Sequence, residues 1–248
     1  MLLCGLTLAT PTTRAAEPID TDGPDFVESS ETVPKGRFQY EVDMVAEQNR
    51  RVSPRTTDLS TPALLKYGVG ETMELRVAPG GYIRRGNRYG MADTAFGLKW
   101  HTQDRDEKTG TPAVSWIAHV EAPTGSGMVR GQGARPSLRS VITWDLPFNL
   151  ALGVMPGIKS DTTAEGRRFT SAILGVVLNR RINENFRFFV EMSVAQIARA
   201  RDGGVLNSWD LGAAYVVTPD LQIGARAGVG ANRNSPNGFV LFELAQRF

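Results

Sequence analysis

Three residues near the middle of the sequence could carry acid–base chemistry, because they share one face of an expected strand. Ser115, His119 and Glu121 are spaced by even numbers, and side chains of an extended strand alternate between its two faces. A histidine beside a carboxylate can act as a general base for a serine hydroxyl, so an outer-membrane lipid hydrolase is one interpretation. Such an enzyme places its nucleophile at the lipid face, whereas the alternation here turns all three side chains inward. The sequence therefore favours a protein that is not an enzyme.

The sequence contains no motif that is typical of a metal site or of a cofactor-binding site. His101 and His119 are the only histidines, Cys4 is the only cysteine, and neither histidine has a second ligand at the spacing of a zinc site. The glycine-rich segment 228–230 falls in an expected strand and lacks the strand–loop–helix context of a nucleotide-binding loop. We therefore expect no catalytic residue, no bound metal and no cofactor.

Charged side chains instead fall repeatedly on one face of an expected strand. Glu41 and Asp43, for example, alternate with Tyr40, Val42 and Met44. On a soluble protein these charges would face solvent, but in a membrane barrel they would line the lumen and pair across strands. The candidate lumen-lining residues are Glu41, Asp43, Lys66, Glu74, Arg76, His119, Glu121, Arg139, Glu191, Asp210, Arg226 and Glu243.

The elements that position these residues are strands, because apolar side chains recur with a period of two along most of the chain. The sequence predicts an all-β fold, a transmembrane antiparallel β-barrel of about 12 strands, with 10 to 14 strands compatible with the pattern. The expected strands cover residues 38–44, 62–69, 73–77, 96–100, 115–121, 138–144, 148–154, 169–179, 186–192, 209–215, 222–227 and 238–248.

The connections alternate between tight turns and long polar stretches. Short turns are expected at residues 70–71, 145–147, 182–185 and 218–220, and longer stretches such as 80–90 and 123–134 lie between them. Outer-membrane barrels have short periplasmic turns and longer external loops, so both termini should lie on the periplasmic side. The long stretch 101–112 on the short-turn side breaks this rule.

The last strand ends on an aromatic residue. Val240, Phe242, Leu244 and Phe248 share its apolar face, and Phe248 is the final residue of the chain. An apolar strand face that meets lipid, with an aromatic side chain at the interface, explains this ending. We expect Phe248 to be an assembly signal that the barrel-assembly machinery reads through the C-terminal strand.

The amino-terminal region has two parts. Residues 1–16 form an apolar run with a small-residue end, which predicts a signal peptide. Residues 17–35 carry six acids against one lysine and three prolines, so we expect an extended acidic N-terminal tail that is periplasmic or plugs the barrel, followed by the barrel at residues 36–248. The net charge of +2 gives no electrostatic case for binding nucleic acid.

Three stretches resemble a known family. Asp20–Gln39, the strand and turn from Pro62 through Arg76, and the turn Thr218–Gln222 are similar to the outer-membrane "transporter" family named for the MetA pathway of phenol degradation. The resemblance implies an outer-membrane barrel linked to the uptake of hydrophobic compounds. Gly23 is a departure, since this family is expected to have arginine there.

The sequence thus predicts a passive channel or transporter in the cell outer membrane of a Gram-negative bacterium, for small compounds that include hydrophobic or aromatic ones. Its partners would be the lipid bilayer, the assembly machinery and an unidentified solute. The alternatives are a lipid-hydrolase-like enzyme, a structural or adhesive barrel, and a soluble lipocalin-like barrel whose apolar face turns inward.

Overall fold

The computed structural model describes residues 18–49, 56–163 and 165–248, and the expected signal peptide at residues 1–16 lies outside the described residues. The described chain is built from antiparallel strands and two single-turn 3-10 helices, η1 (Gly127–Val129) and η2 (Ala200–Asp202). The strands are β1 (Phe38–Asn49), β2 (Thr56–Ser60), β3 (Ala63–Gly68), β4 (Met73–Ala78), β5 (Tyr82–Arg85), β6 (Arg88–Met91), β7 (Thr94–Gln103), β8 (Ala113–Ala122), β9 (Arg135–Leu146), β10 (Leu150–Thr162), β11 (Arg168–Arg181), β12 (Phe186–Ile197), β13 (Val205–Thr218), β14 (Leu221–Gly230) and β15 (Gly238–Arg247).

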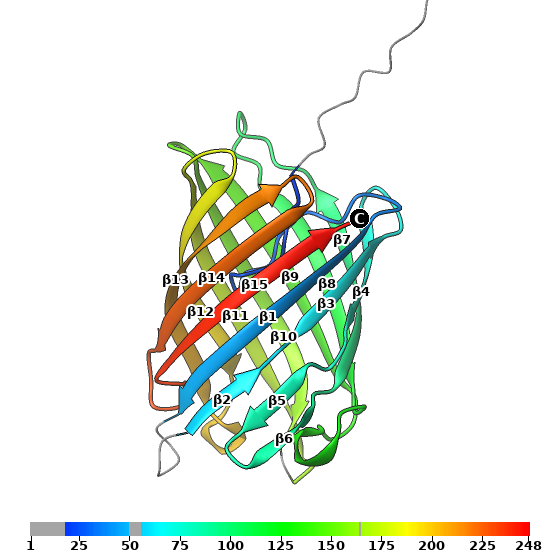
Figure 1. Ribbon diagram of the computed structural model, residues 1–248, viewed down its shortest axis with the longest axis vertical. Helices are drawn as coiled ribbons and strands as arrows, with labels where there is room; N and C mark the ends of the chain where they lie inside the picture. The colour runs from blue at the N-terminus through cyan, green and yellow to red at the C-terminus, as the bar shows by residue number, and fades with distance from the viewer. Residues whose placement is uncertain (1–17, 50–55, 164) are drawn as a thin grey trace, which may run out of the picture.

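The sheet closes on itself, because β1 pairs with β15 along its whole length, from Gln39 opposite Arg247 to Gln48 opposite Gly238 (Figure 1). The fifteen described strands fill twelve positions around this barrel. Strands β2 and β3 both pair with β1, and β5 continues β4 while β6 continues β7. The predicted twelve-stranded antiparallel barrel is therefore confirmed.

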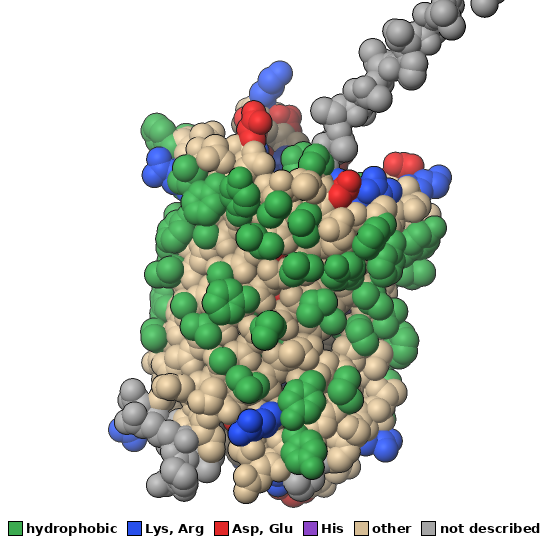
Figure 2. Space-filling model, viewed as in Figure 1, with side chains coloured by type: hydrophobic (Ala, Val, Ile, Leu, Met, Phe, Trp, Pro, Cys, Tyr) green, Lys and Arg blue, Asp and Glu red, His purple; other side chains and the backbone are tan. Residues whose placement is uncertain are grey.

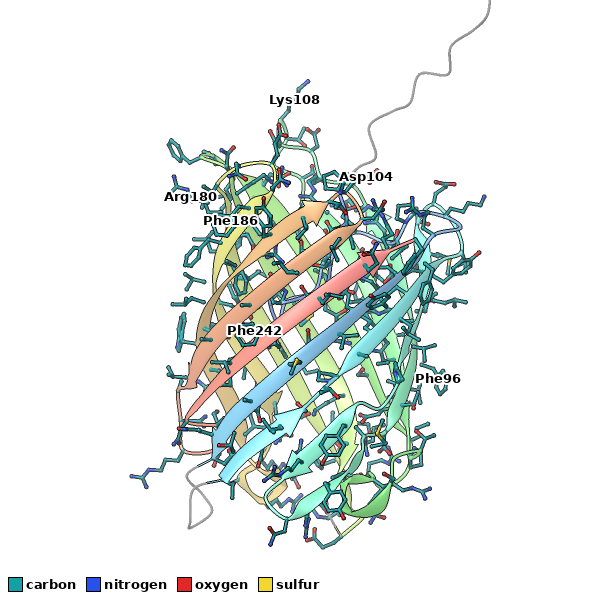
Figure 3. The ribbon with its side chains drawn as sticks, in the orientation of Figure 1. Phe96, Asp104, Lys108, Arg180, Phe186 and Phe242 are labelled. Carbon is teal, nitrogen blue, oxygen red and sulfur yellow. The ribbon has the colours of Figure 1, made fainter. Side chains whose placement is uncertain are left out.

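The outer surface of the barrel wall is apolar. Leu75, Phe96, Leu211 and Phe242 are each more than half exposed, as side chains on the outward face of the alternation must be. Figure 2 shows hydrophobic side chains over the wall, with charged side chains gathered near the two rims. Phe96 and Phe242 stand on the outside of the wall in Figure 3. An exposed apolar band of this kind is stable only against lipid, which excludes the soluble lipocalin-like barrel.

Among the described residues, no helix has the length and apolar character needed to cross a membrane.

The two rims differ as predicted. The C-terminus and the short turns, such as Val69–Thr72 between β3 and β4, lie at the upper rim in Figure 1, and the longer connections lie at the lower rim. Two expected boundaries were wrong. Residues 80–90 are largely strands β5 and β6 rather than a loop, because the chain resumes pairing after Gly80 and Gly81. Strand β7 extends to Gln103, so the unusual connection at the upper rim covers residues 104–112.

Candidate functional site

The acidic tail runs inside the barrel. It enters beside the β13–β14 turn, where the Ile19 amide donates to the Pro219 carbonyl at 2.7 Å, and leaves at Lys35, which bridges to Gly68 (Figure 1). Ile19, Asp22, Val27, Ser30 and Val33 are all buried. These side chains are enclosed by the surrounding strands, so the tail occupies the lumen over residues 18–34.

Asp22 is the most strongly held residue of the tail. Its carboxylate lies 2.6 Å from Lys99 Nζ, 2.9 Å from Lys66 Nζ and 3.1 Å from Arg76 Nη2. Burial raises the pKa of Asp22, but the positive charges of Arg76, Lys66 and Lys99 outweigh it and hold the pKa well below its usual range. The tail therefore carries a stable negative charge where three strands supply cations.

Two further tail carboxylates meet arginines of the wall. Glu28 accepts from Arg76 Nη2 at 2.6 Å and pairs with Arg139 on β9. Asp25 pairs with Arg187 on β12 at 2.8 Å. Arginine donates several hydrogen bonds in a fixed plane, which suits it to buried carboxylates. The ion pairs thus attach the tail to several sides of the barrel.

Inward-facing carboxylates of the wall bind the backbone of the tail. Glu191 accepts the amides of Phe26 and Val27 at 2.8 and 2.7 Å, and Glu74 accepts the amide of Val33 at 2.7 Å. Glu41 accepts the amide of Asp22 at 3.2 Å and also pairs with Lys66. These contacts satisfy amides that would otherwise be buried without a partner.

A second group of acids lies around β1 and β13–β15. Asp43 is directly opposite Glu243, so two carboxylates face each other across neighbouring strands. Arg226 lies 3.1 Å from Glu191 and 3.7 Å from Asp210. Within the described part of the chain, Glu243 Oε1 and both carboxylate oxygens of Asp210 have no hydrogen-bond partner.

The residues that could have formed a hydrolase site do not come together as one. The Ser115 hydroxyl donates to the Ser30 carbonyl of the tail and lies 3.2 Å from His101 Nδ1. His119 instead accepts a hydrogen bond from Arg139 at 2.9 Å, and Glu121 pairs with Arg135. Ser115 is thus engaged in holding the tail.

One side of the lumen is apolar. Ile117, Val141, Met155, Val177 and Phe189, from β8 to β12, form a buried cluster that includes Val27 of the tail. Phe26 packs against this cluster, and a Cβ atom at Gly175 would lie 2.5 Å from Val27 Cγ2. We call this cluster the apolar wall. The tail therefore presents acids to the basic strands and hydrophobic side chains to the apolar wall.

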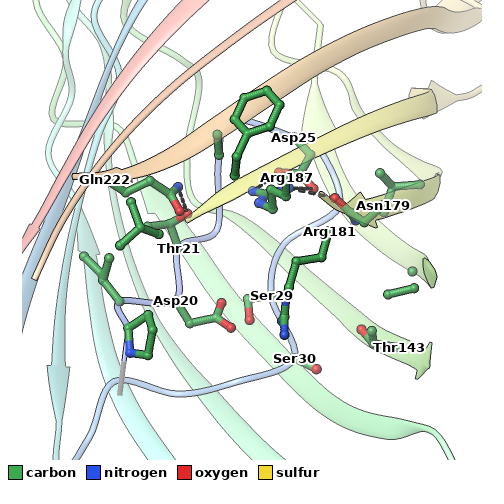
Figure 4. Close-up of a pocket in the computed structure, with 18 of the residues that line it drawn as sticks. Asp20, Thr21, Asp25, Ser29, Ser30, Thr143, Asn179, Arg181, Arg187 and Gln222 are labelled. Atoms are coloured by element: carbon green, nitrogen blue, oxygen red, sulfur yellow. Dashed lines mark hydrogen bonds and ion pairs between the residues drawn. The ribbon is translucent and has the colours of Figure 1, made fainter. Parts of the chain in front are cut away.

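A cavity of about 660 Å³ opens between the tail and the apolar wall toward the short-turn rim (Figure 4). Val27, Ala151, Val177 and Ala214 give it apolar sides, and polar groups such as Asn179 and Arg181 also line it. Its volume suits a small organic molecule, because ligand pockets typically span about 300–1,000 Å³.

Sequence reasoning did not identify the tail acids as site residues. Asp22, Asp25 and Glu28 come from the segment expected to be extended. The available signal was complementary charge, since a tail with six acids precedes strands whose inward faces carry Lys66, Arg76 and Lys99.

Phe248 lies at the seam where the barrel closes. Its ring stacks on those of Tyr40 and Phe38, at centroid distances of 6.0 and 6.4 Å, and its amide donates to the Phe38 carbonyl at 2.8 Å. The terminal residue is thus part of the pairing between the last strand and the first.

A closed twelve-stranded barrel with an apolar outer band and a charged interior is an outer-membrane β-barrel. The chain belongs to the family described as "Putative MetA-pathway of phenol degradation", which it matches over residues 21–248. A search of curated protein sequences gives no match.

Solved structures share the fold at low sequence identity. The COG4313 outer membrane channel from Pseudomonas putida F1 superposes with a TM-score of 0.70 at 12% identity, covering 89% of this chain and 98% of that one. The NanC porin gives a TM-score of 0.61 at 11% identity, covering 84% and 98%. The β domain of the Bordetella autotransporter BrkA gives 0.51 at 13% identity, covering 86% and 99%.

Proposed function

We propose that this protein is a passive outer-membrane channel for small compounds, including hydrophobic or aromatic ones. The apolar wall is the observation that carries this proposal. If the tail only had to fill the lumen, charge pairs could hold it on every side, and no apolar surface would be needed. The family description refers to phenol degradation, and the similar Pseudomonas structure is described as an outer membrane channel.

The solute path we propose follows the apolar wall. On the basic side the tail is held by buried ion pairs of Asp22 and Glu28, whereas Phe26 and Val27 meet the wall through apolar contacts. Apolar contacts can be exchanged for those of an aromatic ring. Displacing Phe26 and Val27 also breaks their amide hydrogen bonds to Glu191, but Glu191 keeps its ion pair with Arg226 at 3.1 Å, so no buried charge is left unpaired. A displaced Val27 would open the wall into the cavity, which leads to the periplasmic rim.

In this proposal the candidate lumen-lining residues keep the tail in place and set the polar side of the path. Lys66, Arg76 and Arg139 bind tail carboxylates, and Glu74 and Glu191 bind tail amides. The engagement of Ser115 with the tail supports a role without catalysis.

Solute entry into proteoliposomes tests the proposal. Benzoate and arabinose would be compared for the full-length protein and for a variant that lacks residues 18–34, alongside planar-bilayer conductance. We expect the deletion to raise both conductance and benzoate entry. Met155→Trp in the deletion variant should reduce benzoate entry, because its ring would fill the path at the apolar wall.

The matched control is Leu211→Trp, which places the same ring on the lipid-facing surface, where Leu211 is 55% exposed. It should leave solute entry unchanged. A deletion variant that folds but passes neither solute would contradict a channel and favour a structural or adhesive barrel.

A further inference from the structure

The exposed charges of the two rims differ sharply. Each described connection of the long-connection rim has an exposed arginine within it or at the end of an adjoining strand, for example Arg84, Arg130, Arg168, Arg199 and Arg233. Glu165 is the exposed acid among the described residues there. The short-turn rim mixes exposed cations such as Lys108 and Arg180 with exposed acids such as Asp104, Glu107 and Glu184. The basic character is therefore a property of one rim.

The orientation of the barrel places this basic rim outside the cell. The start of β1 and the end of β15 both lie at the short-turn rim, where Phe38 pairs with Phe248. Outer-membrane barrels keep their short turns in the periplasm. The long-connection rim is then level with the head groups of the outer leaflet, which in this membrane is made of phosphorylated lipopolysaccharide.

Arg84 faces outward at this rim, toward lipid. It lies directly opposite Leu59 on β2 and Tyr89 on β6, which are 41% and 67% exposed, and Leu59 in turn lies opposite Ala46 on β1. The exposed guanidinium of Arg84 therefore lies among side chains of the lipid-facing band. Figure 2 shows Lys and Arg side chains beside hydrophobic ones near the lower rim. An arginine next to tyrosine at the edge of the band is suited to reach an interfacial anion.

Arg168 makes a second outward position on another part of the rim. It shares the outward face of β11 with Leu178, since Val177 is buried in the lumen. Its Nη1 donates to the Ala134 carbonyl and to Ser160 Oγ, both at 3.0 Å. These bonds hold the side chain at the wall through one guanidinium nitrogen, and Arg168 remains exposed. A fixed planar guanidinium is well suited to a phosphate.

We propose that Arg84 and Arg168 bind phosphate groups of lipopolysaccharide at the outer rim. The exposed cations of this rim are arginines throughout the described residues, which favours phosphate recognition over a general attraction of anions. A surface that collects anionic solutes would instead need its arginines on the inner side of the mouth, whereas these two share faces with lipid-facing residues.

Binding of bisphosphorylated lipid A to the full-length protein in nanodiscs tests this inference, with dephosphorylated lipid A as the comparison lipid. The double variant Arg84→Gln/Arg168→Gln should bind the bisphosphorylated lipid at least fivefold more weakly, and the lipid should no longer raise its unfolding temperature. Arg180→Gln is the matched control, because Arg180 is an exposed arginine at the opposite rim (Figure 3). Heat-modifiable gel migration verifies that each variant is folded.

Two results would overturn the proposal. The folded double variant could bind lipid A as tightly as the original protein, or dephosphorylated lipid A could bind as tightly as the phosphorylated form. In the first case, slower benzoate entry through the double variant would assign the arginines to solute capture.

Discussion

Asp22 Oδ1 lies 2.6 Å from Lys99 Nζ, although 77 residues separate the two in the sequence. The same Lys99 nitrogen also donates to the carbonyls of Ser29 and Glu31. One buried lysine therefore contacts the tail at three points, which fixes both its charge and its backbone course. Removing one member of such a buried pair leaves the other charge without compensation.

The first prediction concerns Asp22→Asn. The variant leaves Lys66, Arg76 and Lys99 facing a neutral amide, so tail docking should weaken by about 3–5 kcal/mol. Ser30→Cys provides the measurement, because Ser30 is 2% exposed and the only natural cysteine is Cys4 in the expected signal peptide. Maleimide labelling of that cysteine in folded protein should become much faster when Asp22→Asn is added.

The control for this experiment is Glu107→Gln, which neutralises an exposed acid of the upper rim. It should leave labelling unchanged. Equal labelling rates with and without Asp22→Asn would show that the ion pairs do not hold the tail.

The second prediction concerns pH. Burial raises the pKa of Glu28, but Arg139 and Arg76 lower it more, with Asp22 opposing and Lys99 assisting them, so the pKa falls from 4.5 to about 2. Because docking lowers the pKa of Glu28, the ionised Glu28 carboxylate stabilises the docked tail at pH values above its ordinary pKa of 4.5. This stabilisation is lost as the pH falls from 4.5 toward 2. Conductance should thus stay constant from pH 7 to about pH 4.5 and rise below it. A rise already between pH 7 and pH 5 would contradict the assignment.

The sequence predicted the barrel well because its signal is local. Alternation along residues such as Glu41, Val42 and Asp43 reports which face meets lipid, whatever the rest of the chain does. The sequence did not predict strands β2, β5 and β6, because they are only four or five residues long. Pro62 lies between β2 and β3, residues 79–81 separate β4 from β5, and Ala92 and Asp93 separate β6 from β7. Four residues are too few to distinguish alternation from chance.

The path of the tail through the lumen could not be predicted from local alternation. The acids of residues 17–35 and the inward cations were both evident, but charge alone does not decide which acid meets which cation. Asp22 pairs with Lys99 on β7 and Glu28 pairs with Arg139 on β9 because these strands lie beside the two tail residues in the closed barrel. Only the three-dimensional arrangement shows which strands lie beside each tail residue.

The third prediction concerns the unusual connection at residues 104–112, which we expect to add a small contribution to holding the tail. Arg105 on this connection lies 2.6 Å from Glu31 of the tail and 3.1 Å from Asp145 at the end of β9. Arg105→Ala should speed the labelling of Ser30→Cys by less than about fivefold, because a pair that is one-third exposed contributes about 0.2–1 kcal/mol. Labelling as fast as in Asp22→Asn would give this connection a larger role than its exposure allows.

The fourth prediction concerns Gly23, where the family resemblance implies arginine. A Cβ atom at this position would lie 2.2 Å from Glu243 Oε1, which has no hydrogen-bond partner among the described residues. Gly23→Arg should move the flexible Glu243 side chain and give its carboxylate a cation, so the labelling of Ser30→Cys should slow. A hydrogen bond to a charged group contributes about 1.5–3 kcal/mol.

Gly23→Leu separates charge from size in this experiment. It imposes the same displacement on Glu243 but offers no cation, so labelling should be faster than in the unsubstituted protein. If both variants labelled faster, the displacement of Glu243 would outweigh any pairing.

The last prediction concerns Phe248 as an assembly signal. Its ring stacks on Tyr40 and Phe38, so it joins the last strand to the first at the point where the barrel closes. Deleting Phe248 should reduce the heat-modifiable, membrane-inserted fraction severalfold, since the assembly machinery would meet a last strand without its terminal aromatic. Benzoate entry per correctly inserted molecule should not change, because Phe248 is 61% exposed and lies outside the lumen.

Phe242→Ala is the matched control: Phe242 is equally exposed, at 61%, on the same strand. An equal loss of insertion in both variants would show that lipid contact alone, rather than the terminal position, makes Phe248 important.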